Sequence, residues 1–437
     1  MSLKAGFLMS NQNMEFKDSQ IAWIGQIPKH WEVTKINHLY SQRNQKVSDK
    51  DFEPLSVTKK GILPQLENAA KTDNGDNRKL VKIGDFVINS RSDRRGSCGI
   101  SSFDGSVSLI NIVLKPRENM NSKYFDWLFH TTLFADEFYK YGNGIVNDLW
   151  STRWDNMKNI LVPYPPLNEQ KEIAEFLDKK CEIIDKRLSN LERKIKSLKE
   201  YKKSLISECV TKGLNPKNME FKDSQIPWIG EIPKHWKISK IKYECFLKGR
   251  IGWQGLTTAE YIEEGAYLVT GVNFLNGNID WQNCVKVSEW RFNQAPEIQI
   301  KNNDLLITKD GTIGKIALTK DTPKQATLNS GVMLIRPKNK NYYEKFLFYI
   351  LSSDQFWLWF SYINSGNTTI IHLYQNSFDN FSFTLPPLNE QKEIAEFLDK
   401  KCKKIDRLNE NYTKQIATLK EYKKSLIYEC VTGKKEI

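Results

Sequence analysis

The stretch P-P-L-N-E-Q-K-E-I-A-E-F-L-D-K-K-C at 165–181 decides the fold, because it recurs without a change at 386–402. The same offset aligns L-K-E-Y-K-K-S-L-I at 198–206 with 419–427, and E-C-V-T at 208–211 with 429–432. A shorter repeat opens each half, M-E-F-K-D-S-Q-I-A-W-I-G-Q-I-P-K-H-W at 14–31 and M-E-F-K-D-S-Q-I-P-W-I-G-E-I-P-K-H-W at 219–236. The segments between these repeats differ. A duplicated frame around two inserts predicts one scaffold that presents two different surfaces.

The long repeat has the pattern of a coiled-coil helix. A proline pair precedes it, Asn168 is a candidate N-cap, and acidic residues follow in the first turn. Apolar residues then recur with a period of about 3.5 residues, as in a coiled-coil seam. The predicted seam positions are Ile184, Leu188, Leu191, Ile195, Leu198, Leu205, Ile405, Asn409, Tyr412, Ile416, Leu419 and Leu426. Lys202 and Lys423 interrupt both seams at the same place. Asn409 either fixes the register or lies at a frayed edge of the seam.

Connectivity predicts that the two helices are antiparallel. The first ends near Gly213, and the second begins at Asn389, directly after the second insert. Because compact domains have neighbouring termini, the second helix must start where the first one ended. A helix of about 42 residues is roughly 60 Å long, somewhat under two turns of DNA at about 3.4 Å per base pair. The pair is therefore long enough to act as a ruler.

The two inserts have the same order of predicted elements. The first has a strand at 85–89, a basic loop, more β pattern at 106–116 and a helical stretch at 123–141. The second has strand, loop and strand at 303–318, a strand at 330–337 and a helical stretch at 341–360. We predict an α+β protein in which two α/β domains (14–164 and 214–385) are separated by a pair of long antiparallel coiled-coil helices (165–213 and 386–437), with pseudo-two-fold symmetry from the internal duplication.

Composition narrows the function. The 437 residues include 65 Lys and Arg against 52 Asp and Glu, a net charge of +13 that favours a polyanionic partner. No apolar run reaches the roughly 20 residues of a membrane span, and the first residues lack the apolar core of a signal peptide, so we expect a cytoplasmic protein. Seven cysteines without a C-x-x-C pair indicate free thiols. The five histidines are dispersed, so we predict no metal site and a structural role for His30 and His235.

These repeats resemble the DNA-sequence-specificity subunits of type I restriction–modification enzymes. The residues that carry the resemblance are I-P-K-H-W at 27–31 and 232–236, P-L-N-E-Q-K-E-I-A-E-F-L at the head of each long helix, and T-K-D-G-T-I-G-K at 308–315. The resemblance extends from about residue 14 to the end of the sequence. It implies two target recognition domains, each of which reads one half of a bipartite DNA site through the major groove. The helix pair would set the gap between the halves.

The resemblance also implies partners. The subunit would bind double-stranded DNA, two modification subunits that methylate adenine from S-adenosylmethionine, and restriction subunits that carry the ATP-driven translocase and nuclease. We expect no cofactor in the chain itself, because S-adenosylmethionine, ATP and Mg²⁺ would belong to those partners. The sequence agrees with a non-catalytic subunit. Its only Pro-Pro pairs precede the long helices, and it contains neither a [DNS]-P-P-[FYW] motif nor a G-x-x-x-x-G-K-[ST] loop.

Basic loops that follow strands are the candidate DNA-binding elements. Arginine can contact guanine O6 and N7 bidentately or hold a phosphate, and loops on a rigid sheet are frequent binding sites. The candidates are Asn89, Arg91, Ser92, Arg94 and Arg95 in the first domain and Arg250, Thr308, Lys309, Thr312 and Lys315 in the second. Arg250 belongs to a second glycine-rich basic turn, K-G-R-I-G-W-Q-G at 248–255. The alternative for each loop is an ordinary solvated turn.

Other residues have two interpretations. Polar residues in the loops before the proline pairs either reach base edges or form turns, and we favour turns for Asn143, Asn147, Arg153, Asn367 and His372. Aromatic residues at helical spacing are either core or stacking platforms, and we favour core for Trp127, Phe134, Phe138, Trp357 and Trp359. Three classes of protein remain. A DNA-reading adaptor explains every feature, a self-contained methyltransferase or nuclease lacks its motifs, and a structural coiled coil leaves the basic inserts unexplained.

Overall fold

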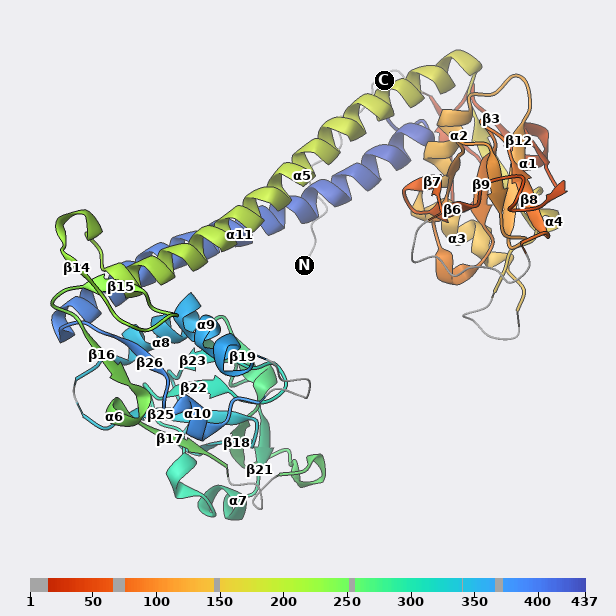
Figure 1. Cartoon of the computed structure of the whole chain (residues 1–437). Coiled ribbons are helices and arrows are strands. Elements are labelled where there is room, and N and C mark those ends of the chain that lie inside the picture. Colours follow the sequence, from red (N-terminus) through yellow and green to blue (C-terminus); the bar gives the residue numbers. More distant parts are fainter. Residues whose placement is uncertain (1–14, 66–74, 145–149, 251–255, 340, 366–371) are drawn as a thin grey trace. The chain divides into compact units, whose positions relative to one another are not determined.

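The computed structural model (Figure 1) describes residues 15–65, 75–144, 150–250, 256–339, 341–365 and 372–437. The chain divides into two compact units. Unit 1 combines Met1–Glu192 with Thr413–Ile437, and unit 2 is Arg193–Tyr412. Each unit therefore holds one insert together with a segment of both long helices, whereas the boundaries predicted from sequence separate the helices from the inserts.

In unit 1 a four-stranded antiparallel sheet in the order β10-β9-β12-β4 packs on a three-stranded sheet in the order β11-β8-β5. The described elements are β1 (Phe16–Asp18), β2 (Gln26–Pro28), β3 (Glu32–Lys35), α1 (Ile36–Leu39), β4 (Tyr40–Gln42), β5 (Lys46–Val47), β6 (Leu55–Thr58), β7 (Gly61–Pro64), β8 (Arg78–Val81), β9 (Phe86–Asn89), β10 (Cys98–Ile100), β11 (Gly105–Val107), β12 (Asn111–Pro116), α2 (Ser122–Phe129), α3 (Thr132–Lys140), α4 (Trp154–Met157) and β13 (Leu161–Tyr164).

Unit 2 repeats the four-stranded sheet in the order β23-β22-β25-β17, and its three-stranded sheet has the order β21-β18-β24. The described elements are β14 (Phe221–Asp223), β15 (Glu231–Pro233), β16 (Lys237–Lys240), α6 (Ile241–Glu244), β17 (Cys245–Gly249), β18 (Ala266–Val269), β19 (Phe274–Leu275), β20 (Asn278–Ile279), β21 (Val285–Val287), α7 (Glu289–Asn293), β22 (Leu305–Thr308), β23 (Ile316–Leu318), β24 (Ala326–Leu328), β25 (Val332–Pro337), α8 (Glu344–Ser352), α9 (Asp354–Ile363), α10 (Gln375–Phe378) and β26 (Ser382–Leu385).

The shared fold of the inserts is confirmed for the larger sheet. Its central strands are buried on both faces, which explains their unbroken apolar sequence. In β9, Phe86 and Ile88 pack towards the helices while Val87 packs on the smaller sheet, and β22 alternates in the same way. The smaller sheets differ, because β8 pairs with β11 antiparallel whereas β18 pairs with β24 parallel.

The helical stretch predicted in each insert is two helices rather than one. Thr131 caps α3 by accepting the Phe134 N–H at 3.2 Å, and Ser353 caps α9 by accepting the Gln355 N–H at 3.2 Å. A hydroxyl residue that bonds to nearby backbone favours a cap over a helix interior, so the chain turns at both positions. The resulting helix pairs cover the sheet with aromatic side chains, among them Phe134, Phe138 and Trp359, which are core residues as predicted.

The two long repeats form the longest helices, α5 (Leu167–Lys212) and α11 (Leu388–Val431). Each begins one residue before its predicted N-cap. In unit 1 the start of α5 packs with the end of α11, since Leu177 and Cys181 share a core cluster with Cys430. In unit 2 the end of α5 packs with the start of α11 in the same way (Figure 1). The helices are therefore antiparallel, as predicted.

All twelve predicted seam positions are buried or half-buried. Ile184, Leu191, Ile405 and Leu426 are buried, and the other predicted positions are half-buried: Leu188, Ile195, Leu198, Leu205, Asn409, Tyr412, Ile416 and Leu419. The interrupting lysines form interhelical ion pairs, Lys202 with Asp406 in unit 2 and Lys423 with Asp185 in unit 1, each at 2.7 Å. The two ion pairs join equivalent positions of the repeat, so both units have the same register. The role of Asn409 as a register pin stays a prediction.

The short repeats anchor the insert to the long helices. Trp31 donates its indole N–H to Glu169 of α5 at 2.8 Å, and His30 lies 2.9 Å from the same carboxylate. The copies Trp236 and His235 contact Glu390 of α11 at 2.9 and 2.7 Å. The two histidines thus position a helix start.

Candidate nucleic-acid interface

Two loops leave the central strands at equivalent places. Loop 90–97 follows β9 and leads into β10, and loop 309–315 follows β22 and leads into β23. The backbone frame is shared, because Ser90 O accepts the Thr152 N–H and Lys309 O accepts the Leu373 N–H, both at 3.0 Å. Each loop is therefore held at the end of a buried strand by the segment that precedes α4 or α10.

Loop 90–97 brings together the arginines that the sequence singled out. Arg91 Nε and Arg94 Nε lie 3.1 and 3.6 Å from the two carboxylate oxygens of Asp93. Arg95 forms an ion pair with Asp136 of α3. The Arg94 side chain is 67% exposed, and all three guanidinium groups stay close to the surface. Exposed pairs of this kind are weak, so the arginines remain able to exchange an aspartate for a phosphate or a base edge.

The other two candidates of this domain shape the loop. Asn89 ends β9, and its side-chain oxygen accepts the Arg91 N–H at 3.0 Å. Ser92 opens a short 3-10 helix and donates its backbone N–H to Trp150 O at 2.9 Å. Both contacts set the path of the loop.

Loop 309–315 is organised by Thr308 and Lys315. The buried Thr308 hydroxyl donates to Thr312 O at 2.5 Å and accepts the Lys315 N–H at 2.9 Å. Lys315 Nζ donates to Gly271 O at 3.0 Å, so its charge ties the loop to the turn after β18. Thr308 and Lys315 therefore position the loop, while Lys309 is half-buried and Thr312 is exposed.

The segments that precede α4 and α10 contact these two loops. Asp310 pairs with His372 at 2.6 Å, and Arg91 forms a β-bridge with Ser151. Asn143 also bridges to Ser151, which agrees with a turn role, and Arg153 is exposed at the start of α4. Asn147 and Asn367 lie outside the described residues.

The prediction of an exposed basic turn is wrong for Arg250. This residue is 3% exposed and donates from Nε to Leu328 O at 2.8 Å and from Nη2 to Thr327 Oγ1 at 3.1 Å. Burial lowers the pKa of its guanidinium. Arg250 thus holds β24 from within the domain, and residues 251–255 lie outside the described part of the chain.

The aromatic residues of the second helix pair have two environments. Trp359 is buried in the core, as predicted, whereas Trp357 is partly exposed and lies against loop 309–315. A Cβ built on Gly314, which has φ +79°, would lie 2.7 Å from the Trp357 ring. Gly314 therefore lets the loop approach this indole closely.

In the first helix pair, Trp127 donates its indole N–H to Asp178 of α5 at 2.9 Å and is half-buried.

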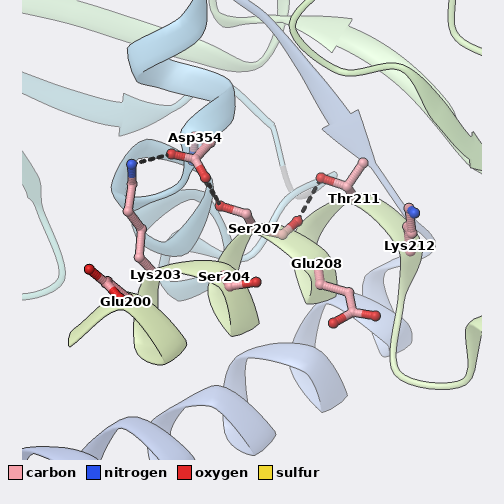
Figure 2. Close-up of a pocket in the computed structure, with 8 residues that line it drawn as sticks. All are labelled: Glu200, Lys203, Ser204, Ser207, Glu208, Thr211, Lys212 and Asp354. Atoms are coloured by element: carbon pink, nitrogen blue, oxygen red, sulfur yellow. Dashed lines mark hydrogen bonds and ion pairs between the residues drawn. The ribbon is translucent and has the colours of Figure 1, made fainter. Parts of the chain in front are cut away.

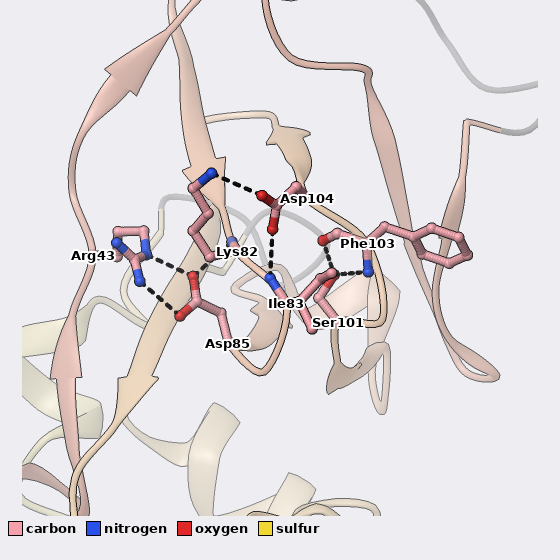
Figure 3. A network of polar contacts seen from close by, with 7 residues as sticks. All are labelled: Arg43, Lys82, Ile83, Asp85, Ser101, Phe103 and Asp104. Carbon is pink, nitrogen blue, oxygen red and sulfur yellow. Dashed lines mark hydrogen bonds and ion pairs between the residues drawn. The ribbon is translucent and has the colours of Figure 1, made fainter.

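Buried carboxylates fix the opposite ends of the central strands. Asp85 accepts bonds from Arg43 at 2.6 and 3.1 Å and from the Lys82 N–H at 2.9 Å (Figure 3). The hydrogen bond to Asp85 raises the pKa of Arg43. In unit 2 the equivalent Asp304 pairs with Arg336 at 2.6 Å. Arg43 follows β4, whereas Arg336 lies in β25, so the two domains secure the same strand end by different arginines.

A shallow polar pocket lies between the end of α5 and the start of α9 in unit 2 (Figure 2). Asp354 accepts from Lys203 at 2.6 Å and from the Ser207 hydroxyl at 3.1 Å. Lys203, Ser207 and Asp354 thus pair with one another, as expected of a contact between helices. Within the described ranges no cluster of His, Cys, Asp or Glu could hold a metal ion, and no helix found there is long and apolar enough to cross a membrane.

Comparison with known proteins gives the family. A model described as "Type I restriction modification DNA specificity domain" matches residues 28–199 and 233–418. Over 425 residues the chain is 27% identical to the MjaVIII specificity subunit of a type I restriction enzyme from Methanocaldococcus jannaschii, with 93% of each chain covered. It is 24% identical over 434 residues to the putative MjaX specificity subunit of that organism, covering 94% of this chain and 95% of the relative.

Solved structures support the same fold. A chain from a structure titled for complex assembly and conformational transition of the type I R-M system matches with a TM-score of 0.71 at 14% identity, covering 93% of this chain and 98% of that one. The HsdS subunit from Thermoanaerobacter tengcongensis matches with a TM-score of 0.54 at 16% identity and the same coverage. Because one family match falls in each half, the chain belongs to the type I restriction–modification DNA specificity family and is a specificity subunit with two target recognition domains.

Proposed function

We propose that this chain binds a bipartite double-stranded DNA sequence, with one half-site read by each domain, and directs partner subunits to methylate or cleave that DNA. It acts without a catalytic site or cofactor of its own. S-adenosylmethionine serves the modification subunits, and ATP and Mg²⁺ serve the restriction subunits.

The observation that carries the proposal is the pairing of a repeated frame with two different loops. Both units have the same central sheet, the same anchor between a tryptophan and a helix glutamate, and the same backbone bond to the end of the central strand. At that strand end one domain presents arginines and the other presents Lys309 and Thr312. A reader of two different half-sites requires a constant frame with divergent contact residues, since base identity is read by side chains at base edges.

The repeated frame also supports binding of two identical partners. Five surface residues at the start of α5 recur unchanged and exposed in α11, namely Lys171, Glu172, Glu175, Lys179 and Lys180, repeated as Lys392, Glu393, Glu396, Lys400 and Lys401. Exposed side chains contribute little to the fold. Their identity in two units therefore favours two copies of one partner, the modification subunit, on equivalent surfaces.

The helix pair supports a measuring role. Helices α5 and α11 have 46 and 44 residues, so each is about 65–70 Å long at about 1.5 Å per residue. The seam ion pairs join equivalent positions in both units, which agrees with one register along the helices. A helix pair of fixed register gives the unspecified gap between the half-sites a fixed length.

Co-purification tests the proposal. The chain expressed with its modification subunits should form a soluble complex that binds one bipartite sequence, and the complex should methylate adenine in it. The chain alone should bind DNA weakly or aggregate, without methyl transfer or cleavage. A free chain that is monomeric and binds one sequence tightly, or that methylates DNA by itself, contradicts the proposal.

A further inference from the structure

Each domain places one exposed aliphatic side chain at the loop end of its central strand. In unit 2 this residue is Val272, which is 85% exposed, the highest value among the exposed large apolar residues that the structure describes. In unit 1 it is Leu109, which is 42% exposed. The two residues lie on different turns of the inserts and outside the repeated segments. The internal duplication therefore does not explain why both are exposed.

Val272 lies on a turn that is fixed to loop 309–315. The turn follows β18, and Lys315 Nζ binds Gly271 O at 3.0 Å. A Cβ on Gly271 would lie 3.6 Å from the Thr308 methyl group, so the turn approaches the end of β22 closely. Asn329, which precedes β25, donates its N–H to Val269 O at 2.9 Å. Val272 is thus at the same edge as the candidate DNA contacts of this domain.

Leu109 lies at the same edge of the sheet in unit 1, but on a different turn. It lies on the turn between β11 and β12, and Asn111 at the start of β12 pairs directly with Asn89 at the end of β9. Loop 90–97 begins at the next residue, so Leu109 and the three arginines lie at the same end of the sheet.

A buried asparagine holds each turn. Asn273 is 2% exposed, accepts the Thr270 N–H at 2.8 Å and donates to Asn283 O at 3.0 Å. Asn111 is 5% exposed and donates to Ser108 O at 3.2 Å and to the Ser108 hydroxyl at 3.0 Å. An aliphatic side chain that a fixed backbone holds in water does not stabilise the fold, because apolar side chains stabilise a protein by being buried. Such a side chain is suited to an apolar contact with a ligand.

We infer that Val272 and Leu109 are specificity-determining residues, each of which packs on the C5-methyl group of a thymine in the half-site of its own domain. The inference rests on the proposed function. Thymine is distinguished in the major groove by this methyl group, and aliphatic side chains read it by contact. The surrounding cations, Lys309 in one domain and the loop arginines in the other, would hold the phosphates or guanines on either side.

A cycle of thymine-to-uracil substitutions tests the inference. Uracil lacks only the C5-methyl group, so each thymine of the recognised site is replaced singly in an oligonucleotide duplex. Binding is measured with the complex of the full chain and its modification subunits. One thymine of the second half-site should give a loss of about fourfold with the wild-type complex, as one methyl group predicts. With Val272→Ala the same substitution should have no effect.

The variants of Val272 and Leu109 serve as controls for each other. Leu109→Ala should abolish the uracil effect at one thymine of the first half-site and leave the second half-site unchanged. Ile83→Ala provides a third variant, since Ile83 is 68% exposed in the turn before β9, at the other end of that strand, and should change neither half-site.

Several results would overturn the inference while leaving the proposed function intact. These are a uracil effect that survives Val272→Ala, no uracil effect in either half-site, or half-sites without an A·T pair. If Val272→Ala weakens assembly with the modification subunits but leaves the uracil effect unchanged, Val272 is a protein contact and the inference is wrong. A complex that binds no specific sequence would instead refute the proposed function itself.

Discussion

Matched deletion of one heptad from both helices should shorten the gap between the two half-sites. The deletion removes 191–197 from α5 and 412–418 from α11, so Leu198 takes the seam position of Leu191 and Leu419 that of Tyr412. The ion pairs Lys423–Asp185 and Lys202–Asp406 lie outside the deleted segments. Each unit therefore keeps its own register.

The magnitude follows from helix geometry. Seven residues at about 1.5 Å each shorten the pair by about 10 Å, which is about three base pairs at 3.4 Å. Three base pairs also rotate one half-site by about 100° around the duplex, at about 10.5 base pairs per turn. The variant should either select a site with a shorter gap and twist to meet it, or stop binding. The bases within each half-site should not change, because their contacts lie in the inserts.

Stability sets the conditions of the assay. Of the deleted seam residues Leu191 is buried, and Ile195, Tyr412 and Ile416 are half-buried. At about 1.5–3 kcal/mol for a fully buried side chain, the deletion should lower the free energy of unfolding by about 5 kcal/mol. Melting curves should accompany methylome sequencing of the edited strain. Deletion of 191–197 alone is the matched control, since it shifts one helix against the other by seven residues and should break at least one of the two seam ion pairs.

An unchanged gap with normal activity in the matched variant would refute the measuring role of the helices. Altered bases within a half-site would mean that the helices themselves take part in base readout.

Three further predictions concern the loops, the seam and the thiols. Replacing Arg91, Arg94 and Arg95 together by Ala should weaken DNA binding by about 1–3 kcal/mol for each arginine that binds a base bidentately, and should flatten the salt dependence for each arginine that binds a phosphate; unchanged affinity and salt dependence would remove this loop from the interface. Lys202→Asp should lower the melting temperature slightly, since a partly exposed ion pair contributes about 0–1 kcal/mol to stability. Adding Asp406→Lys should restore the melting temperature. Failure of the double variant to recover would show that the pair does not set the register. Burial raises the pKa of Cys181 to about 11 and of Cys209 to about 12, so unfolded thiols ionise first and the free energy of unfolding should fall as the pH rises above about 9; a stability that increases between pH 8 and 10 would contradict this.

Periodic features were predictable from sequence, because each depends on spacing within one segment. The positions that the heptads predicted for the seam are all buried or half-buried, and the unchanged repeat predicted equivalent units. The direction of the helices followed from chain order together with the neighbouring termini of compact domains. The breaks at Thr131 and Ser353 were missed, although both are hydroxyl residues with the capability to cap a helix, because apolar spacing continues across them.

Contacts between distant segments were not predictable. Arg250 is buried because it bonds to Leu328 O and Thr327 of β24, which are remote in sequence, and no local pattern distinguishes it from an exposed arginine. Lys315 was a candidate DNA contact, but its amine binds Gly271 O, which is remote in sequence. Val272 and Leu109 carry no motif. Their exposure results from turns held by Asn273 and Asn111, a property that only the folded chain shows.

Methylome sequencing of a host with and without this gene is the most direct test of readout by two domains. Readout by two domains predicts one bipartite motif that depends on the gene, with two specified half-sites, a methylated adenine in each and a constant gap of unspecified bases between them. Exchange of the second insert for that of another specificity subunit should replace one half-site and keep the other. A contiguous motif, a gap of variable length, or a methylation pattern that does not depend on the gene would contradict the account.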